Sequence, residues 1–377
     1  MRIIIICGAG YISGKEKIMF SLLKGLAAEG DEVYCITSRW SNGQFEDLLI
    51  GGHINYSKMR LGFISKTLNW KSIRMTMDQL IYWPKLLVDY KRILSKFNPD
   101  VVIHTNFHHL FLLFPVIGSH KTINIYHSHE SMGDTRFYKR LFNLFQKKIK
   151  LFVGVSAYVT DKLRNLGISN DKLKTIHNGL EIIQWKPTPL KQGAVFKIGI
   201  VGQVGRWKGH EDVLLALDIL KRKYNLSQFK LCIFGTGDPL FIKELHKLIE
   251  EKHLNDQVEW KGFVKNIEQI YAGLQVVCIP SRSEEPFATS ALEAGLYAVP
   301  VIVSNRGGFP EIVKHSYNGF IVEANAPAEI AKYLALMIED RAMALQTGLN
   351  HQQIVNQSFS INNFISNWKS TLKVLTS

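Results

Sequence analysis

Residues 2–37, RIIIICGAGYISGKEKIMFSLLKGLAAEGDEVYCIT, place a short β-branched run, a longer amphipathic stretch and a second β-branched run in succession. Short continuous apolar runs are typical of strands that are buried on both faces of a sheet. A strand, a helix and a strand in this order form a βαβ unit, in which the two strands are parallel. The opening stretch therefore predicts a parallel sheet covered by helices.

The same alternation continues through the rest of the chain, and a break divides it into two series. The later β-branched runs are DVVIHT, TINIYHS and LFVGVS in the first half and FKIGIVG, FKLCIFGTG, QVEWKG, VVCIP and PVIVS in the second. Between them lies WKPTPLKQGA, whose prolines Pro187 and Pro189 favour a linker. A chain of 377 residues is long enough for two ordinary domains. We therefore expect two doubly wound α/β domains, residues 1–185 and residues 186–355.

The composition is that of a globular protein. Hydrophobic residues make up 46% of the chain, charged residues make up 21%, and the mean hydropathy is near zero. The four cysteines lie in short apolar runs without CxxC or metal-ligand spacing, so we interpret them as small core residues in a reducing compartment. The first apolar run is too short for a signal peptide, and none is long enough to span a bilayer. We expect a cytoplasmic protein.

The net charge of +14 is concentrated in the first half of the chain. Residues 1–185 hold 25 lysines and arginines against 14 acidic residues, a balance of +11. Much of this excess lies in residues 58–96 and in RFYKRLFNLFQKKIK, residues 136–150, where six cations and no acid alternate with apolar residues. Such a face suits an anionic partner, either a phospholipid surface at the inner face of a membrane or a nucleic acid. A solvated helix that packs its apolar side on the core is an equally open interpretation.

Ligands of open parallel sheets bind beyond the carboxyl ends of the strands, so the segments after each strand are where chemistry is expected. Those segments are rich in glycine, cations and carboxylates: CGAGYISGKEK, VGQVGRWKG, FGTGD, PSRSEEPF and SNRGGFPE. Four of the five lie in the second half. The second domain is therefore predicted to bind the phosphate-bearing ligand.

The glycines after the first strand do not form a dinucleotide fingerprint. Gly8, Gly10 and Gly14 stand between a strand and a helix, as in a phosphate loop, but their spacing is not GxGxxG. The second strand, EVYCITSR, ends without the acidic residue that such a site needs for ribose. This disfavours a nicotinamide-dependent dehydrogenase and leaves tight strand-to-helix turns as an alternative.

The segment VGQVGRWKG outlines a cradle for a diphosphate. Its glycines let a ligand approach the backbone closely. The Arg206 guanidinium can donate two parallel hydrogen bonds to phosphate oxygens, and the Lys208 ammonium can supply a point charge. A turn with solvated cations is the alternative if this segment is taken alone.

Two carboxylates, Glu285 and Glu293, flank a predicted helix start. Pro286 suits the first helical position, which leaves Glu285 in the loop while Thr289 to Ala294 form a helix whose free N–H groups face the same space. Carboxylates bind sugar and ribose hydroxyls well, and a helix start can hold a phosphate. A glycosidase pair would have to flank one glycosidic bond, which is difficult from a shared loop and helix.

These motifs carry a resemblance to a known family. PSRSEEPFATSALEAGLYAVPVIVSNRGGFPEIV, residues 280–313, resembles the E-x7-E region of the retaining glycosyltransferases of GT-B fold, of the group 1 or family 4 type. VGQVGRWKG resembles that family's strand and loop with a phosphate-binding Lys-Gly, and residues 155–187 resemble the segment with an Asn-Gly turn, here Asn178 and Gly179. The likeness is weaker in the first half, where it consists of SGKE and YHSHE.

The resemblance implies two Rossmann-like domains facing across a cleft, with residues 356–377 packing back on the first. It also implies transfer of a sugar from a nucleotide-diphosphate sugar to a glycan or lipid-linked acceptor with retention of anomeric configuration. Bacterial-type surface polysaccharide or lipopolysaccharide synthesis is the expected context.

In the second domain the resemblance implies a role for each motif residue. Arg206 and Lys208 neutralise the donor diphosphate, Glu285 binds hydroxyls of the donor sugar, and Glu293 holds the ribose. The phosphate also meets backbone amides at Phe287, Ala288 and Thr289. Ala288 stands where the family usually has glycine.

In the first domain the resemblance implies that Gly14 lets its loop touch the phosphate. Either His129 or His127 lies near the reacting carbon and the acceptor, and we prefer His129 because an acidic residue follows it. Ser13 replaces the first glycine of the family's pair.

The leaving diphosphate gains negative charge during transfer and needs a positive partner. No D-x-D motif and no cluster with metal spacing occurs in the sequence, so we expect Arg206, Lys208 and helix N-termini to supply that partner without a metal or other cofactor. The alternatives are a GT-B sugar-nucleotide epimerase or phosphorylase, a sugar-binding protein without turnover, and a basic nucleic-acid-binding protein.

Overall fold

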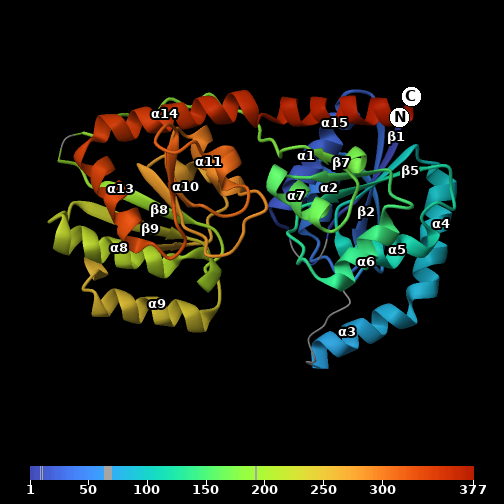
Figure 1. Ribbon diagram of the computed structural model, residues 1–377, viewed down its shortest axis with the longest axis horizontal. Coiled ribbons are helices and arrows are strands. Elements are labelled where there is room, and N and C mark those ends of the chain that lie inside the picture. Colours follow the sequence, from blue (N-terminus) through green and yellow to red (C-terminus); the bar gives the residue numbers. More distant parts are fainter. Residues whose placement is uncertain (9, 11, 63–69, 192) are drawn as a thin grey trace. The chain divides into compact units, whose positions relative to one another are not determined.

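The computed structural model describes residues 1–8, 10, 12–62, 70–191 and 193–377 (Figure 1). Ala9 and Tyr11 of the first glycine-rich loop, and residues 63–69 of the basic region, lie outside this description. The chain divides into two compact units, Met1–Gly179 with Ile361–Ser377 and Leu180–Ser360. Among the described residues, no helix is both long and apolar enough to span a bilayer.

The first unit contains a seven-stranded sheet in the order β3-β2-β1-β4-β5-β6-β7. Its strands are β1 (Arg2–Ile6), β2 (Glu32–Ser38), β3 (Asn55–Met59), β4 (Val101–His104), β5 (Ile123–Ser128), β6 (Leu151–Gly154) and β7 (Leu173–Thr175). Each neighbouring pair is parallel. The two runs of the opening stretch are adjacent strands, with Ile4 opposite Tyr34, so the βαβ prediction is confirmed.

Helices cover the sheet of the first unit. They are α1 (Gly14–Ala28), α2 (Gln44–Gly51), α3 (Trp70–Ile81), α4 (Trp83–Phe97), α5 (Phe107–Leu113), α6 (Arg136–Phe145), α7 (Ala157–Asn165) and α15 (Ile361–Thr376). A capping box starts α1, where the Ser13 N–H donates to Glu16 Oε2 at 2.9 Å. The last helix, α15, packs on α1, because Gly25 leaves room for the side chain of Ile365.

The helices α4, α5 and α6 form one layer over this sheet. Leu86 and Tyr90 of α4 pack with Ile4 of β1 and with Leu112 of α5 in one cluster. The ring of Phe107 in α5 stacks on that of Phe142 in α6 with centroids 5.9 Å apart. In this layer α4 carries the last part of the basic region 58–96, and α6 carries the first part of the basic stretch 136–150.

The second unit contains a six-stranded sheet in the order β10-β9-β8-β11-β12-β13. Its strands are β8 (Phe196–Val201), β9 (Phe229–Phe234), β10 (Val258–Gly262), β11 (Val276–Ile279), β12 (Val301–Ser304) and β13 (Gly319–Val322). Its helices are α8 (His210–Lys223), α9 (Pro239–Glu251), α10 (Ile267–Tyr271), α11 (Thr289–Leu296), α12 (Phe309–Ile312), α13 (Pro327–Glu339) and α14 (Arg341–Ser358). Each neighbouring pair is again parallel, so the predicted α/β class is confirmed for both units.

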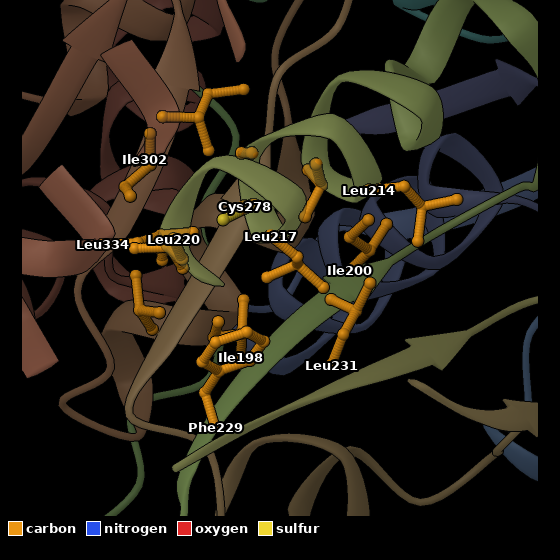
Figure 2. Close-up of a cluster of buried hydrophobic side chains, with 14 of the residues drawn as sticks. Ile198, Ile200, Leu214, Leu217, Leu220, Phe229, Leu231, Cys278, Ile302 and Leu334 are labelled. Carbon is orange, nitrogen blue, oxygen red and sulfur yellow. The ribbon is translucent and has the colours of Figure 1, made fainter. Parts of the chain in front are cut away.

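The core of the second unit packs the strands of its sheet against α8, α9 and α13. Figure 2 shows Ile198 and Ile200 of β8 close to Leu217 of α8, with Cys278 of β11 nearby. All four cysteines of the chain are buried and unpaired, as expected for small core residues. Burial holds the pKa of the Cys278 thiol above its ordinary value, which keeps this thiol protonated.

The substitution Leu217→Ala tests this core. Leu217 is fully buried, so removing its side chain loses apolar burial and leaves a cavity, and we expect the free energy of unfolding to fall by about 2–5 kcal/mol. Denaturation with guanidinium chloride measures the change. Leu240→Ala at the exposed start of α9 is the matched control, and an equal loss in both variants would contradict the assigned core.

Candidate functional site

Three predicted loops meet at the carboxyl ends of β8, β11 and β12. These strands are neighbours in the sheet, so the loops that follow them share one edge. The Arg282 N–H donates to the Trp207 carbonyl oxygen at 2.7 Å, which joins the loops after β11 and β8. The Gly308 N–H donates to the Glu285 carbonyl oxygen at 2.8 Å, which joins the loops after β12 and β11. The backbone thereby gathers segments that are far apart in sequence.

Lys208 and Glu285 form the centre of this edge. Lys208 ends the short 3₁₀ helix η3 (Arg206–Lys208), and its Nζ lies 2.5 Å from Glu285 Oε1. The Ser281 hydroxyl donates to the same oxygen at 2.7 Å. Both charged side chains are largely buried. The carboxylate is therefore held in one orientation. No described residue forms a hydrogen bond with its second oxygen, which can accept hydrogen bonds from a ligand.

A second ion-pair group holds the Lys208 turn in place. The Arg282 guanidinium donates to both oxygens of Asp212, at 2.9 and 2.8 Å, and to Glu211 at 2.5 Å. These hydrogen bonds, first of all those to Asp212, raise the pKa of Arg282 above its ordinary value. Because Asp212 and Glu211 lie in the first turn of α8, Arg282 fastens the start of α8 to the loop after β11. Arg282 lies three residues after the end of β11, within PSRSEEPF, but no role was predicted for it from the sequence.

Gly209 allows the two loops to approach each other closely. It has a φ of +72°, and a Cβ at this position would lie 2.2 Å from the Pro280 carbonyl oxygen. Any side chain here would push the loop after β8 away from the loop after β11.

Glu293 accepts a hydrogen bond from Tyr271, a residue for which no role was predicted from the sequence. The Tyr271 hydroxyl lies 2.9 Å from Glu293 Oε2, to which it donates, and 3.3 Å from the Ser290 carbonyl oxygen. The Tyr271 ring is buried and stacks on Tyr297 with centroids 5.8 Å apart. Burial and the Glu293 carboxylate hold the pKa of Tyr271 well above its ordinary value, so the phenol remains a proton donor. Tyr271 therefore orients this carboxylate.

The helix predicted for Thr289 to Ala294 is confirmed, but Pro286 does not occupy its first position. Helix α11 begins at Thr289, and Pro286 lies in the preceding loop. Glu285 remains in the loop, as predicted. Ala288 occupies the N-cap position, and its methyl group cannot accept the hydrogen bond that serine or aspartate would take from the first turn. Phe287 and Ala288 are buried, so the first N–H groups of α11 are held at a fixed place on this edge.

Arg206 is turned away from Glu285 in this structure. Its Nη2 donates to Glu244 Oε1 of α9 at 2.6 Å, and its guanidinium lies over the Phe241 ring at 4.8 Å. The side chain is 59% exposed. The structure therefore brings Lys208 to Glu285 but not Arg206, and a phosphate role for Arg206 requires its side chain to turn.

The first unit places Gly14 and the two candidate histidines at the carboxyl edge of its own sheet. Gly14 begins α1, directly after the N-cap Ser13. His127 lies in β5 and His129 follows it, with 3.2 Å between His127 Nδ1 and His129 Nε2. The His127 ring packs edge-on against Trp368 of α15 at 5.0 Å. His127 is thereby committed to the core, whereas His129 is partly exposed.

Both histidines are neutral at physiological pH. Burial lowers the pKa of His127 to about 3. Burial, the neighbouring His127 and the Lys15 ammonium lower the pKa of His129 well below its ordinary value. A neutral imidazole is a hydrogen-bonding group rather than a cation. Within the described ranges, no three His, Cys, Asp or Glu side chains cluster so as to hold a metal ion.

The substitution Gly209→Ala tests the close approach of the two loops. A left-handed backbone conformation costs alanine about 1–2 kcal/mol, and the clash with Pro280 adds to that, so we expect a loss of about 3 kcal/mol or more. Gly262→Ala is the matched control, because Gly262 has a φ of +63° and no atom within 4 Å of the added carbon. Chemical denaturation of both variants measures the difference, and equal losses would contradict the contact with Pro280.

Family models match both halves of the chain. Residues 12–183 match the model described as Glycosyltransferase Family 4, and residues 182–354 match the model described as Glycosyl transferases group 1. An uncharacterized glycosyltransferase of Methanocaldococcus jannaschii is 29% identical over 219 residues, which is 54% of each chain. The capsular polysaccharide biosynthesis glycosyltransferase CapM of Staphylococcus aureus is 27% identical over 175 residues, 44% of this chain and 42% of CapM. The chain thus spans about half the length of the curated relatives it matches.

A solved structure shares the whole fold. Anabaena Alr3699/HepE in complex with UDP aligns with a TM-score of 0.84 over 99% of this chain and 100% of the other, at 22% sequence identity. Both sheets, with their helices, therefore have the GT-B architecture that the resemblance implied. Since the two family models together match nearly the whole chain, and the residues that carry the motifs meet at one sheet edge, the chain belongs to the group 1 glycosyltransferases.

Proposed function

We propose that the protein transfers a sugar from a nucleotide-diphosphate sugar to a glycan or lipid-linked acceptor, with retention of anomeric configuration. Bacterial-type surface polysaccharide or lipopolysaccharide synthesis is the context. The observation that carries this proposal is the group formed by Lys208, Glu285 and Ser281 beside the start of α11, with the oriented Glu293 on the same helix. Capsular polysaccharide synthesis by CapM, and UDP bound to HepE, support the context and the ligand class.

Each part of the donor has a suitable partner in the second unit. The ribose diol suits Glu293, whose carboxylate accepts two directed hydrogen bonds and is oriented by Tyr271. The diphosphate suits Lys208 and the N–H groups of residues 287–289. When a diphosphate draws Lys208 toward itself, Glu285 keeps its bond to Ser281 and gains accepting capacity for sugar hydroxyls. The ion pair therefore holds Lys208 and Glu285 in place until the donor binds to each of them.

The same groups account for departure of the diphosphate. As the glycosidic bond breaks, negative charge develops on the phosphate oxygens, and the Lys208 ammonium and the α11 start are already oriented toward such a charge. These positive groups support a proposed transfer without a metal ion or other cofactor. In the first unit, we propose that neutral His129 exchanges hydrogen bonds with the reacting sugar or acceptor, and that Gly14 admits a phosphate at the start of α1.

Nucleotide binding is the first test. In the presence of EDTA we expect one nucleoside diphosphate among UDP, GDP and ADP to raise the thermal midpoint selectively, since a ligand at 100 times its Kd adds about 2.7 kcal/mol of stability. Glu293→Ala should abolish the rise. Glu251→Ala, which removes an exposed carboxylate of α9, should preserve it. No response to any nucleoside diphosphate would contradict the donor site.

The Tyr271→Phe variant tests the orientation of Glu293. It removes one hydroxyl and keeps the ring that stacks on Tyr297, so the thermal midpoint of the free protein should change little. We expect the Kd of the selected nucleoside diphosphate to rise about five- to tenfold, as is typical for loss of a hydrogen bond to a charged group. Isothermal titration calorimetry measures this change, and an unchanged Kd would show that Glu293 does not depend on Tyr271.

Turnover separates the roles of the two cations. We expect Lys208→Met to lower kcat for sugar transfer about 100-fold or more, because its ammonium meets the leaving charge. Arg206→Met should have a smaller effect if Arg206 keeps its contact with Glu244. Steady-state release of nucleoside diphosphate measures both variants. An equal loss would show that Arg206 turns to the donor, and binding without any turnover would favour a sugar-binding protein.

A further inference from the structure

One face of α3 is apolar and directed to solvent. Trp70, Met77 and Ile81 are 80%, 56% and 67% exposed, and Ile73 and Leu80 are also exposed. At 100° per residue these five side chains lie within an arc of about 100° on the helix. Isolated apolar side chains are common on protein surfaces, but a continuous stripe of this kind indicates an interaction site.

The opposite face of α3 is fastened to the first unit by polar contacts. Gln79 is buried, and its Oε1 accepts a hydrogen bond from the Gly62 N–H at 2.7 Å. Asp78 pairs with Arg60 at 3.3 Å, and the Arg60 guanidinium lies 3.5 Å from the centroid of the Tyr82 ring. Figure 1 shows α3 standing away from the sheet. The helix is thus held with its apolar side outward, the reverse of an ordinary surface helix.

Exposed cations and apolar side chains also lie on α4 and α6 of the same unit. On α4 the exposed Val88 lies among Lys85, Lys91, Arg92 and Lys96, which are also exposed. On α6, in the same helix layer, the exposed Phe137 and Leu144 lie among exposed basic residues. These residues are Arg136, Lys139 and Arg140. The surface therefore combines positive charge with large apolar side chains.

We propose that α3, together with the basic faces of α4 and α6, is a docking surface for anionic phospholipid bilayers. The apolar face of α3 enters the boundary between headgroups and acyl chains, with Trp70 suited to that depth, and the cations meet anionic headgroups. A nucleic acid would use the cations but gives no role to an aliphatic stripe. A second copy of this chain would bring two positive surfaces together, which opposes self-association.

This surface contains none of the donor residues of the second unit. The docking proposal can therefore be disproved while the proposed transferase activity holds. It deepens the proposed function in one respect, because a protein that docks on anionic lipid is suited to a lipid-linked acceptor. The nucleoside diphosphate experiments do not depend on it.

Vesicle binding tests the surface in the full-length protein. We expect cosedimentation with phosphatidylcholine vesicles that contain phosphatidylglycerol to exceed that with pure phosphatidylcholine by about tenfold or more, and to weaken as salt rises. The double variant Leu80→Glu/Ile81→Glu should reduce partition at least about tenfold. Val374→Glu places one such charge at an exposed apolar position of α15 and should bind as the unmodified protein does.

A site-specific label tests insertion. The four native cysteines are buried, so Ile81→Cys can be labelled selectively with an environment-sensitive dye. We expect a blue shift, and quenching by lipid-borne quenchers, on addition of the anionic vesicles. Val374→Cys, labelled in the same way, should show neither.

Other outcomes overturn the proposal. Failure to bind anionic vesicles at low salt, or equal binding by the α3 double variant, would exclude α3 as the docking element. Tight binding of a DNA duplex or single-stranded RNA that competes with the vesicles would assign the cations to nucleic acid. Sedimentation velocity that shows a dimer in the unmodified protein and a monomer in the α3 double variant would make this stripe an interface between copies.

Discussion

The parallel pairing of β8 with β11 and of β11 with β12 is the constraint on which the candidate donor site depends. Parallel strands end at the same edge, so the loops that follow them must meet there. Two backbone hydrogen bonds, from Arg282 to Trp207 and from Gly308 to Glu285, fix the separation of these loops. Gly209 permits that separation because it has no side chain to meet Pro280. The chemistry of the site follows from this backbone arrangement.

Charge at this edge is arranged in two kinds of pair. Arg282 with Asp212 and Glu211 joins groups that both belong to the scaffold, and it fixes the start of α8. Lys208 with Glu285 joins two groups that we propose a nucleotide-diphosphate sugar recruits separately. The second pair keeps both charges neutralised within the free protein, and a donor that supplies an anion and hydroxyls offers each of them a partner. One pair is structural and the other is exchangeable.

The two units differ in where their charged and polar side chains lie. The second unit gathers charged side chains at the carboxyl edge of its sheet. The first unit has the buried His127 and the partly exposed His129 there, and desolvation keeps both uncharged. Its positive charge lies instead on the helix layer, where α4 and α6 are basic and α3 presents aliphatic and aromatic side chains to solvent. The first unit is thus suited to contacts with a large surface, and the second to a small charged ligand.

Sequence alone determined the fold class and most of the candidate donor residues, because local pattern carries that information. The β-branched runs of RIIIIC and FKIGIVG predicted parallel strands, and the residues after each run included Lys208, Glu285 and Glu293. The resemblance to the glycosyltransferases rested on the same segments and is confirmed by the family models.

The tertiary structure decided how those residues are used. The contact of Lys208 with Glu285 joins positions 77 residues apart, and the contact of Tyr271 with Glu293 joins positions 22 apart, so no local pattern reveals either. It turned Arg206 toward Glu244 and packed His127 on Trp368. It also left the apolar face of α3 outward, since the periodicity of a helix shows that a stripe exists but not which side the rest of the protein covers.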